Sequence, residues 1–172
     1  MEFDTGLRKY AIQEIYKMHE RLFATRGNAI CEELASLIPK NKFDFEPFPE
    51  LMLISEEKVM TILPGLLFCI ADMNWPIASE MVKVLARFPN SVVPFIKEIL
   101  KPAEMDEDWK SFIISGLIPE LPREAQALLM EDVQRISCSP TRGEIGAYVN
   151  EVAGNYIKGV KKNLSITPAP KQ

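Results

Sequence analysis

An apolar stretch at residues 63–88, interrupted by the polar corner Asp72-Met73-Asn74-Trp75-Pro76, constrains the fold more than any other feature of this sequence. Ahead of the corner, apolar side chains would cover most of the circumference of a helix. Behind it, they recur at steps of three and four residues, which is the spacing of a helix with one apolar face. The stretch therefore predicts a helical hairpin whose first helix has to be covered by neighbours on more than one side.

The rest of the chain carries further helix signals and no pattern that favours a sheet. Ser55 before two glutamates, and a capping box formed by Thr141 and Glu144, are typical helix starts. Residues 40–49 hold three phenylalanines between prolines, which predicts an irregular segment whose rings pack on neighbouring helices; a binding surface made of these rings is the alternative. The helices expected outside the hairpin are 7–25, 29–37, 92–100, 109–117, 122–137 and 142–162.

The hairpin resembles a known repeat. Pro64, Asp72 eight positions later and Ile77 five further on resemble the HEAT repeat, a helical hairpin that stacks into solenoids, although Ala78 replaces the arginine usual there. A second corner, Asp106-Glu107-Asp108-Trp109, echoes the first at a spacing of 34 residues, which indicates a degenerate internal repeat. The resemblance implies an all-α fold of HEAT-like stacked hairpins, a short α-solenoid with a right-handed α-α superhelix.

A second resemblance covers a longer region, about residues 34–138. Its motifs, in order, are Leu37-Ile38-Pro39-Lys40, the segment 44–53, Ser55-Glu56-Glu57, Leu63-Pro64-Gly65-Leu66-Leu67 and Asp72-Met73-Asn74-Trp75-Pro76-Ile77-Ala78. Together they resemble a functionally uncharacterised family of bacterial all-helical domains. This resemblance implies a HEAT-like helical fold and brings no assigned chemistry with it.

Composition sets the class of protein. With 172 residues, the chain is expected to form one all-helical domain, 1–164, and a loose tail, 165–172, without needing a metal or a disulfide to fold. Its net charge of −4 disfavours general binding to nucleic acid. Three separated cysteines, a start without signal-peptide features and the absence of a long apolar stretch predict a cytoplasmic protein that does not enter a membrane.

The sequence offers little material for catalysis. A single histidine, His19, and three scattered cysteines do not match an ordinary zinc site, and no glycine-rich phosphate loop or nucleophile elbow is present. We therefore expect no metal and no cofactor. The acidic run at residues 106–108 is interpreted as a helix start and not as a cation site.

The two tryptophan corners give the one candidate binding site. The hypothesis is that Trp75 and Trp109 flank a groove lined by Asp72, Asn74 and Asp108, which grips a peptide or a small ligand; the alternative is that the indoles are wedges in the core. The first functional hypothesis is accordingly a non-catalytic bacterial module that binds a protein or peptide. The alternatives are an immunity-type inhibitor of a basic toxin and a small enzyme with a carboxylate near Asp72, or His19, as its base. The lowest-ranked hypothesis is that the protein acts on nucleic acid in the manner of HEAT-like glycosylases.

Overall fold

The computed structural model of this chain describes residues 6–23, 30–102 and 106–166. Within these ranges every regular element is helical and no strand occurs, so the predicted all-α class is confirmed. The elements are α1 (Gly6–Phe23), α2 (Glu32–Ser36), α3 (Phe48–Leu51), α4 (Glu56–Phe68), α5 (Ala78–Ala86), α6 (Pro89–Leu100), α7 (Glu107–Phe112), a π-helical turn η1 (Ile113–Leu117), a 3-10 turn η2 (Ile118–Glu120), α8 (Arg123–Cys138), α9 (Arg142–Gly146) and α10 (Val149–Ile166).

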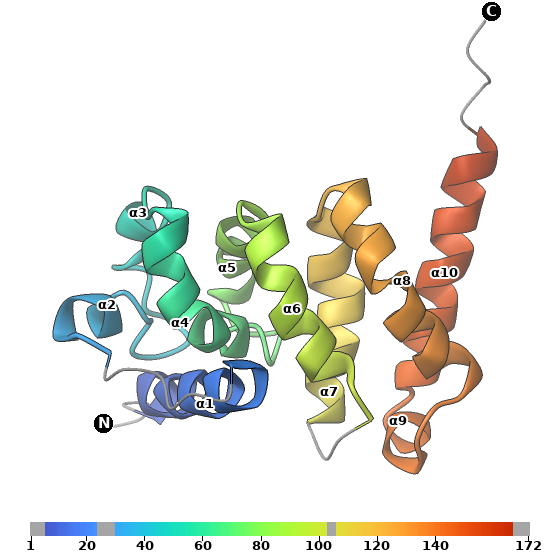
Figure 1. The fold of residues 1–172 in the computed structure, drawn as a ribbon, viewed down its shortest axis with the longest axis horizontal. Helices are drawn as coiled ribbons and strands as arrows, with labels where there is room; N and C mark the ends of the chain where they lie inside the picture. The colour runs from blue at the N-terminus through green and yellow to red at the C-terminus, as the bar shows by residue number, and fades with distance from the viewer. Residues whose placement is uncertain (1–5, 24–29, 103–105, 167–172) are drawn as a thin grey trace, which may run out of the picture.

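The helices form an elongated row. Figure 1 shows α4, α6, α8 and α10 following one another along the long axis, with α1 running beneath α4 and α10 at one end of the row. Helix α1 packs on α4 and α6, α6 packs on α8, and α8 packs on α10. Each helix in the row therefore packs on the next one.

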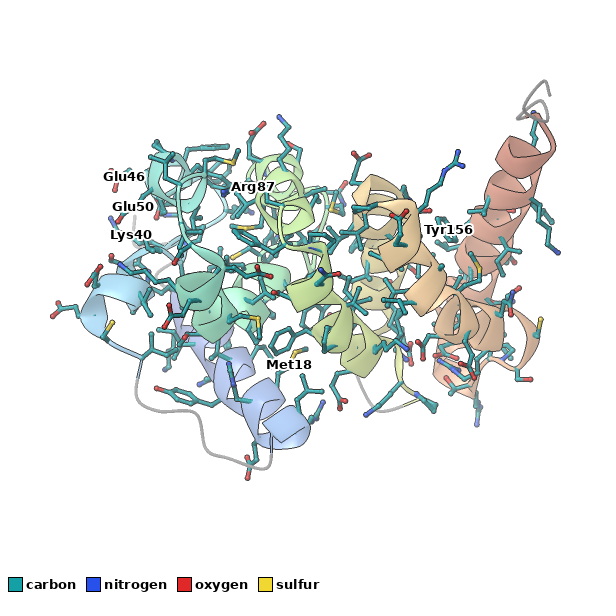
Figure 2. All side chains as sticks on the ribbon, turned by 45° about the horizontal axis from the view of Figure 1, so that its top comes forward. Met18, Lys40, Glu46, Glu50, Arg87 and Tyr156 are labelled. Atoms are coloured by element: carbon teal, nitrogen blue, oxygen red, sulfur yellow. The ribbon has the colours of Figure 1, made fainter. Side chains whose placement is uncertain are left out.

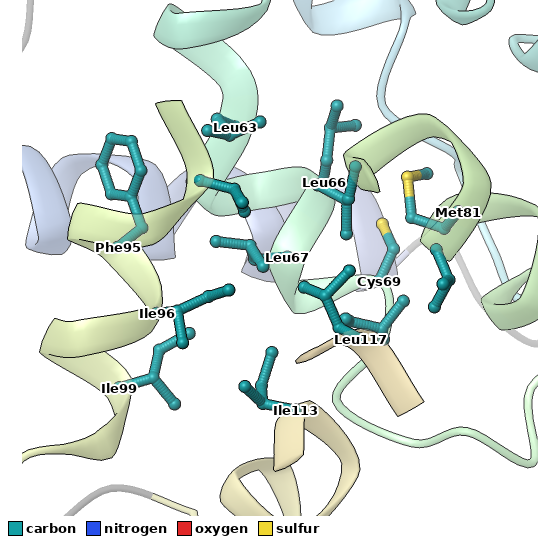
Figure 3. Close-up of a cluster of buried hydrophobic side chains, with 14 of the residues drawn as sticks. Leu63, Leu66, Leu67, Cys69, Met81, Phe95, Ile96, Ile99, Ile113 and Leu117 are labelled. Carbon is teal, nitrogen blue, oxygen red and sulfur yellow. The ribbon is translucent and has the colours of Figure 1, made fainter. Parts of the chain in front are cut away.

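Helix α4 is deeply buried, as its apolar circumference predicts. Its Leu63, Leu66 and Leu67 have no exposed surface and meet side chains of α6 and η1 in the cluster of Figure 3. On another side α1 comes close because position 65 is glycine: a Cβ there would lie 2.8 Å from Cδ1 of Ile15. The first helix of the hairpin is thus covered on more than one side, as expected.

The segment around residues 40–49 departs from its prediction. Its end folds as the short helix α3, and only Phe48 of the three phenylalanines is buried. Phe43 is 64% exposed, so the expectation that all three rings pack on neighbouring helices is wrong for it, whereas Phe45, 45% exposed, keeps its ring centroid 5.7 Å from that of Phe48 in α3. Between Phe43 and Phe45 the carboxylate of Asp44 is buried, where it accepts hydrogen bonds from the backbone N–H groups of Lys40 and Glu46 and so closes the loop.

The predicted helix 109–117 changes type along its length. It begins as α7 and continues as the π-helical turn η1, which buries Ile113, Ile114 and Leu117 together. A π turn is wider than an α turn and lets almost consecutive apolar residues reach the core. Gly116 receives the side chain of Met73 from the first corner, whose Cε would lie 3.0 Å from a Cβ there.

The predicted helix 142–162 is two helices in the structure. The capping box of Thr141 and Glu144 is formed as expected, but α9 ends at Gly146 and α10 starts at Val149. Between them Tyr148 has a φ of 58°, a left-handed conformation that ends an α-helix. The break redirects the chain so that α10 packs along α8 and α7 while α9 stays beside them.

Candidate functional site

The polar residues of both predicted corners close turns. Asp72 Oδ1 accepts a hydrogen bond of 2.8 Å from the backbone N–H of Asn74, and the carbonyl oxygen of Asp72 accepts one from Trp75. In the second corner, Asp106 Oδ1 accepts from the backbone of Asp108 at 3.0 Å and caps α7. These carboxylates therefore shape the backbone that presents the tryptophans.

The structure brings the two indoles to one phenyl ring, that of Phe68 at the end of α4. The ring centroid of Phe68 lies 6.4 Å from that of Trp75 and 5.9 Å from that of Trp109, both in edge-on geometry. Trp109 is only 3% exposed, and its Nε1 donates to the carbonyl oxygen of Leu67 at 3.2 Å. Trp75 is half-buried and reaches the surface. One indole is thus a core wedge, and the other lies at the molecular surface.

Trp75 lines a cavity of about 270 Å³, which we call the aromatic pocket. The first turns of α1 contribute Leu7 and Tyr10, and the loop after α2 contributes Lys42. Its residues are Gly6, Leu7, Tyr10, Lys42, Phe68 and Trp75. Three aromatic rings and one ammonium group equip this pocket to hold an apolar side chain beside an anionic group.

Sequence reasoning found Trp75 and missed the rest of the pocket. Tyr10 is 57% exposed and belongs to a helix 65 positions before Trp75, and Lys42 belongs to a loop. The one available signal was that Tyr10 lies off the apolar stripe of its helix. Of the five residues predicted to form the groove, Trp75 lines this pocket, whereas Asp72, Asn74, Asp108 and Trp109 do not.

A second group of polar side chains is buried between α7, α8 and α9, and we call it the ion network. Lys110 and Glu144 have no exposed surface, and Lys110 Nζ donates to Glu144 Oε1 at 3.0 Å. Arg135 donates hydrogen bonds of 2.7 and 2.9 Å to the two oxygens of that carboxylate, and it also donates to the carbonyl oxygen of Leu100. Glu107 Oε2 lies 2.9 Å from Lys110 Nζ as an ion pair, without the alignment of a hydrogen bond.

Glu144 is the centre of the ion network. Burial alone would raise the pKa of its carboxyl, but hydrogen bonds from Arg135, from the backbone of Thr141 and from Lys110 outweigh burial and lower that pKa to about 2. The same hydrogen bonding raises the pKa of Arg135. A fully buried carboxylate with this pKa stays ionised at neutral pH and does not take up a proton there. The ion network is therefore suited to hold three helices together, and not to proton transfer.

The remaining reactive side chains are dispersed. His19 Nε2 lies 3.3 Å from the carbonyl oxygen of Thr61, and its ring meets Phe95 edge-on. Cys69 is buried, which raises the pKa of its thiol, whereas Cys31 and Cys138 are exposed. Over residues 6–23, 30–102 and 106–166, no group of three or more histidine, cysteine, aspartate or glutamate side chains is arranged to hold a metal ion. Among the helices of those ranges, none has the length and apolar character needed to cross a membrane.

Comparison with known proteins adds one finding. The profile of a family described as "Domain of unknown function (DUF5071)" matches residues 37–157. No protein in a search of curated proteins matches this chain significantly. The matched region holds Lys42, Phe68, Trp75 and the whole ion network, whereas α1, which completes the aromatic pocket, precedes it. Because the match covers more than half of the sequence, this chain belongs to the DUF5071 family of domains of unknown function.

Proposed function

We propose that this chain is a HEAT-like helical module that binds a protein or peptide partner through the aromatic pocket and does not itself catalyse a reaction. The observation that carries the proposal is the half-buried indole of Trp75, which lines a pocket of about 270 Å³ together with the exposed ring of Tyr10. Large aromatic side chains that keep part of their surface accessible dominate the binding energy of many protein interfaces. The bacterial, cytoplasmic setting expected from the sequence suits such a module.

The pocket defines the chemistry of the group that it would take. Leu7, Phe68 and Trp75 give it apolar walls, and Lys42 lines it as well, with its ammonium nitrogen 5.6 Å from the ring centroid of the neighbouring Phe43. An aromatic or aliphatic side chain fills such a space, and a neighbouring carboxylate pairs with the lysine. The preferred ligand is therefore a peptide segment with an apolar anchor next to an aspartate, a glutamate or a carboxyl terminus.

The buried Trp109 acts in this proposal as a support for the pocket. Its ring contacts Phe68 edge-on, as the ring of Trp75 does, and so helps to fix the phenyl group that both indoles share. The neighbouring helices fix Trp109 through burial and through its hydrogen bond to Leu67. A preorganised pocket loses less side-chain entropy on binding than a mobile one.

The alternative of an enzyme with a carboxylate near Asp72 has less support. Asp72 Oδ1 accepts the backbone N–H of Asn74 and so contributes to the turn. His19 has a backbone carbonyl oxygen as its neighbour at 3.3 Å. Neither side chain lines the aromatic pocket. The geometry therefore favours a binding role over general acid-base chemistry at this corner.

A selection of displayed random peptides tests the proposal. Peptides selected on the wild-type chain are expected to share an apolar anchor beside an acidic residue, and to bind Trp75→Ala about tenfold or more weakly. Lys42→Ala should weaken binding less, because the lysine is a rim charge. In a Trp109→Phe background Trp75 is the only tryptophan left, so its fluorescence reports ligand binding directly.

The matched control is Tyr148→Ala, which removes an exposed aromatic side chain that does not line the pocket. This variant should bind the selected peptides with unchanged affinity. The proposal fails if Trp75→Ala, folded by circular dichroism, binds them as tightly as the wild type. It fails equally if the selected peptides leave the fluorescence of Trp75 unchanged.

A further inference from the structure

A second cavity lies between α2, α3 and the start of α4, and we call it the acidic groove. Its volume is about 280 Å³. Leu37 and Ile54 are buried and form its apolar floor, and Leu53 stands beside them. Glu33, Glu50 and Lys58 supply the charged groups at its edge. The groove therefore combines an apolar floor with a mostly acidic rim.

The apolar part of the groove is unusually open. Leu53 is 85% exposed, more than any other large apolar side chain in the described residues, and its neighbour Met52 is 44% exposed. The turn after α3 holds Leu53 in this position, because its backbone N–H donates to the carbonyl oxygen of Glu50 at 2.9 Å. Covering such a leucine and the apolar floor beside it with a second apolar surface is favourable, because it removes apolar surface from water.

The chain segment that forms this groove is acidic, although Arg8 and Arg87, from elsewhere in the chain, donate to its backbone carbonyl oxygens at Ile38 and Leu51. Residues 30–58 hold seven acidic and three basic side chains, a formal net charge of −4 that equals the charge of the entire chain. Both exposed lysines of the segment already face a glutamate: Lys40 lies 3.1 Å from Glu46, and Lys58 lies 3.3 Å from Glu33. Figure 2 shows Lys40, Glu46 and Glu50 at the same edge of the molecule. The exposed carboxylates are Glu32, Glu33, Glu46, Glu50, Glu56 and Glu57.

We propose that the acidic groove docks a basic amphipathic segment of a partner protein. An apolar side chain of the segment covers Leu53 and enters the groove, while lysine or arginine side chains on either side reach Glu33 and Glu50. Charge complementarity selects this occupant, since a partner surface with carboxylates would meet like charge at the rim.

The acidic groove and the aromatic pocket are separate sites. They share no lining residue. Both touch α4, but at different ends: Lys58 belongs to the groove and Phe68 to the pocket, which are about 15 Å apart along a helix that rises 1.5 Å per residue. Either site can therefore be removed without touching the other, and each proposal can fail by itself.

A synthetic helical peptide with leucine on one face and lysine on the other is the probe. Two control peptides of the same length replace either all lysines by glutamate or all leucines by serine. We expect the leucine-lysine peptide to bind the full chain, neither control peptide to bind, and the affinity to fall as salt rises from about 50 to about 200 mM. Leu53→Ala and Glu50→Lys should each weaken binding about tenfold.

Matched variants on distant helices of the row test whether the peptide binds this groove specifically or is attracted by exposed apolar and acidic side chains in general. Leu128→Ala removes an exposed leucine of α8, and Glu151→Lys reverses an exposed charge of α10; both should leave the affinity unchanged. Trp75→Ala should also leave it unchanged. The proposal is overturned if the leucine-lysine peptide does not bind, if the serine or glutamate peptide binds as well, or if Leu128→Ala and Glu151→Lys weaken binding as much as their counterparts.

Discussion

Replacing Glu144 by glutamine tests whether the ion network stabilises the fold. The change keeps the size of the side chain and removes its charge, so Lys110 and Arg135 lose their common anionic partner. Lys110 has no exposed surface and cannot turn to water. Its remaining carboxylate is that of Glu107, 2.9 Å away. The variant therefore leaves a buried ammonium group with one partner where it had two.

The pKa of Glu144 gives the size of the expected loss. A fall from the ordinary value of 4.5 to about 2 means that the folded protein stabilises the carboxylate by about 3 kcal/mol relative to the unfolded chain. Breaking a buried ion pair by removing one partner costs a similar amount, about 3 to 5 kcal/mol. Glu144→Gln should therefore lower the free energy of unfolding at pH 7 by about 3 kcal/mol.

The same shift predicts a dependence on pH. Because folding lowers the pKa of Glu144, its contribution is fully present above pH 4.5, the ordinary value, and is lost as pH falls toward 2. At pH 3 the unfolded chain already binds the proton and the folded one mostly does not, so about half of the contribution remains. The difference in stability between wild type and Glu144→Gln should accordingly shrink between pH 5 and pH 3.

Urea unfolding, followed by circular dichroism and by the fluorescence of the buried Trp109, measures this difference. At pH 7 the midpoint of Glu144→Gln should fall by about 1 M or more. Adding Lys110→Met should recover part of the loss, because it removes the charge left under-paired. Glu151→Gln, at an exposed site, is the control and should change little. A loss below about 1 kcal/mol at pH 7, or one that is equal at pH 3, would refute the reasoning.

Three further predictions concern single positions. Gly65→Ala should destabilise the fold by about 1 to 3 kcal/mol, because its Cβ would lie 2.8 Å from the side chain of Ile15. Gly159→Ala should instead stabilise α10 by up to about 1 kcal/mol, because a Cβ at position 159 would point into open space. Urea unfolding of both variants measures the two changes in stability, which should have opposite signs. Tyr148→Gly should be about 1 kcal/mol more stable than Tyr148→Ala, since glycine accepts the φ of 58° without strain, and equal stabilities would contradict this. Of the three cysteines only Cys69 is buried, so a thiol reagent should modify two groups in the native protein and three in urea; a third rapid native group would contradict the burial.

The local features of this fold could be predicted from the sequence because they depend on residues close together in the chain. Ser55 accepts a hydrogen bond from the backbone of Lys58 at the start of α4, and Asp106 caps α7, as their positions indicated. The helix predicted from residue 92 starts earlier: α6 begins at Pro89, with Phe88 before it and no side-chain cap. A fixed proline φ suits a first helical position and makes a polar cap unnecessary there.

The candidate site shows where sequence reasoning stopped. Trp75 and Trp109 occupy equivalent positions after two acidic corners, and nothing in their local sequence says that one stays at the surface while the other is buried. The difference arises because Leu67 offers a carbonyl oxygen to the indole of Trp109, whereas the first turns of α1 meet Trp75 and leave a cavity. The partners of a surface pocket come from distant parts of the chain, and no periodicity records them.

Glu144 illustrates the difference between what the sequence determines and what the tertiary structure decides. The sequence by itself determined its capping role, since a threonine three positions earlier is enough to form the box, and in the same local way it determined the helical class and the hairpin around α4. Only the tertiary structure decided that Lys110 and Arg135, on two other helices, share the carboxylate of Glu144, and that the chain turns at Tyr148 to dock α10. The physical reason is range: caps and apolar periods act within a few residues, whereas burial and ion pairing depend on which helices pack together.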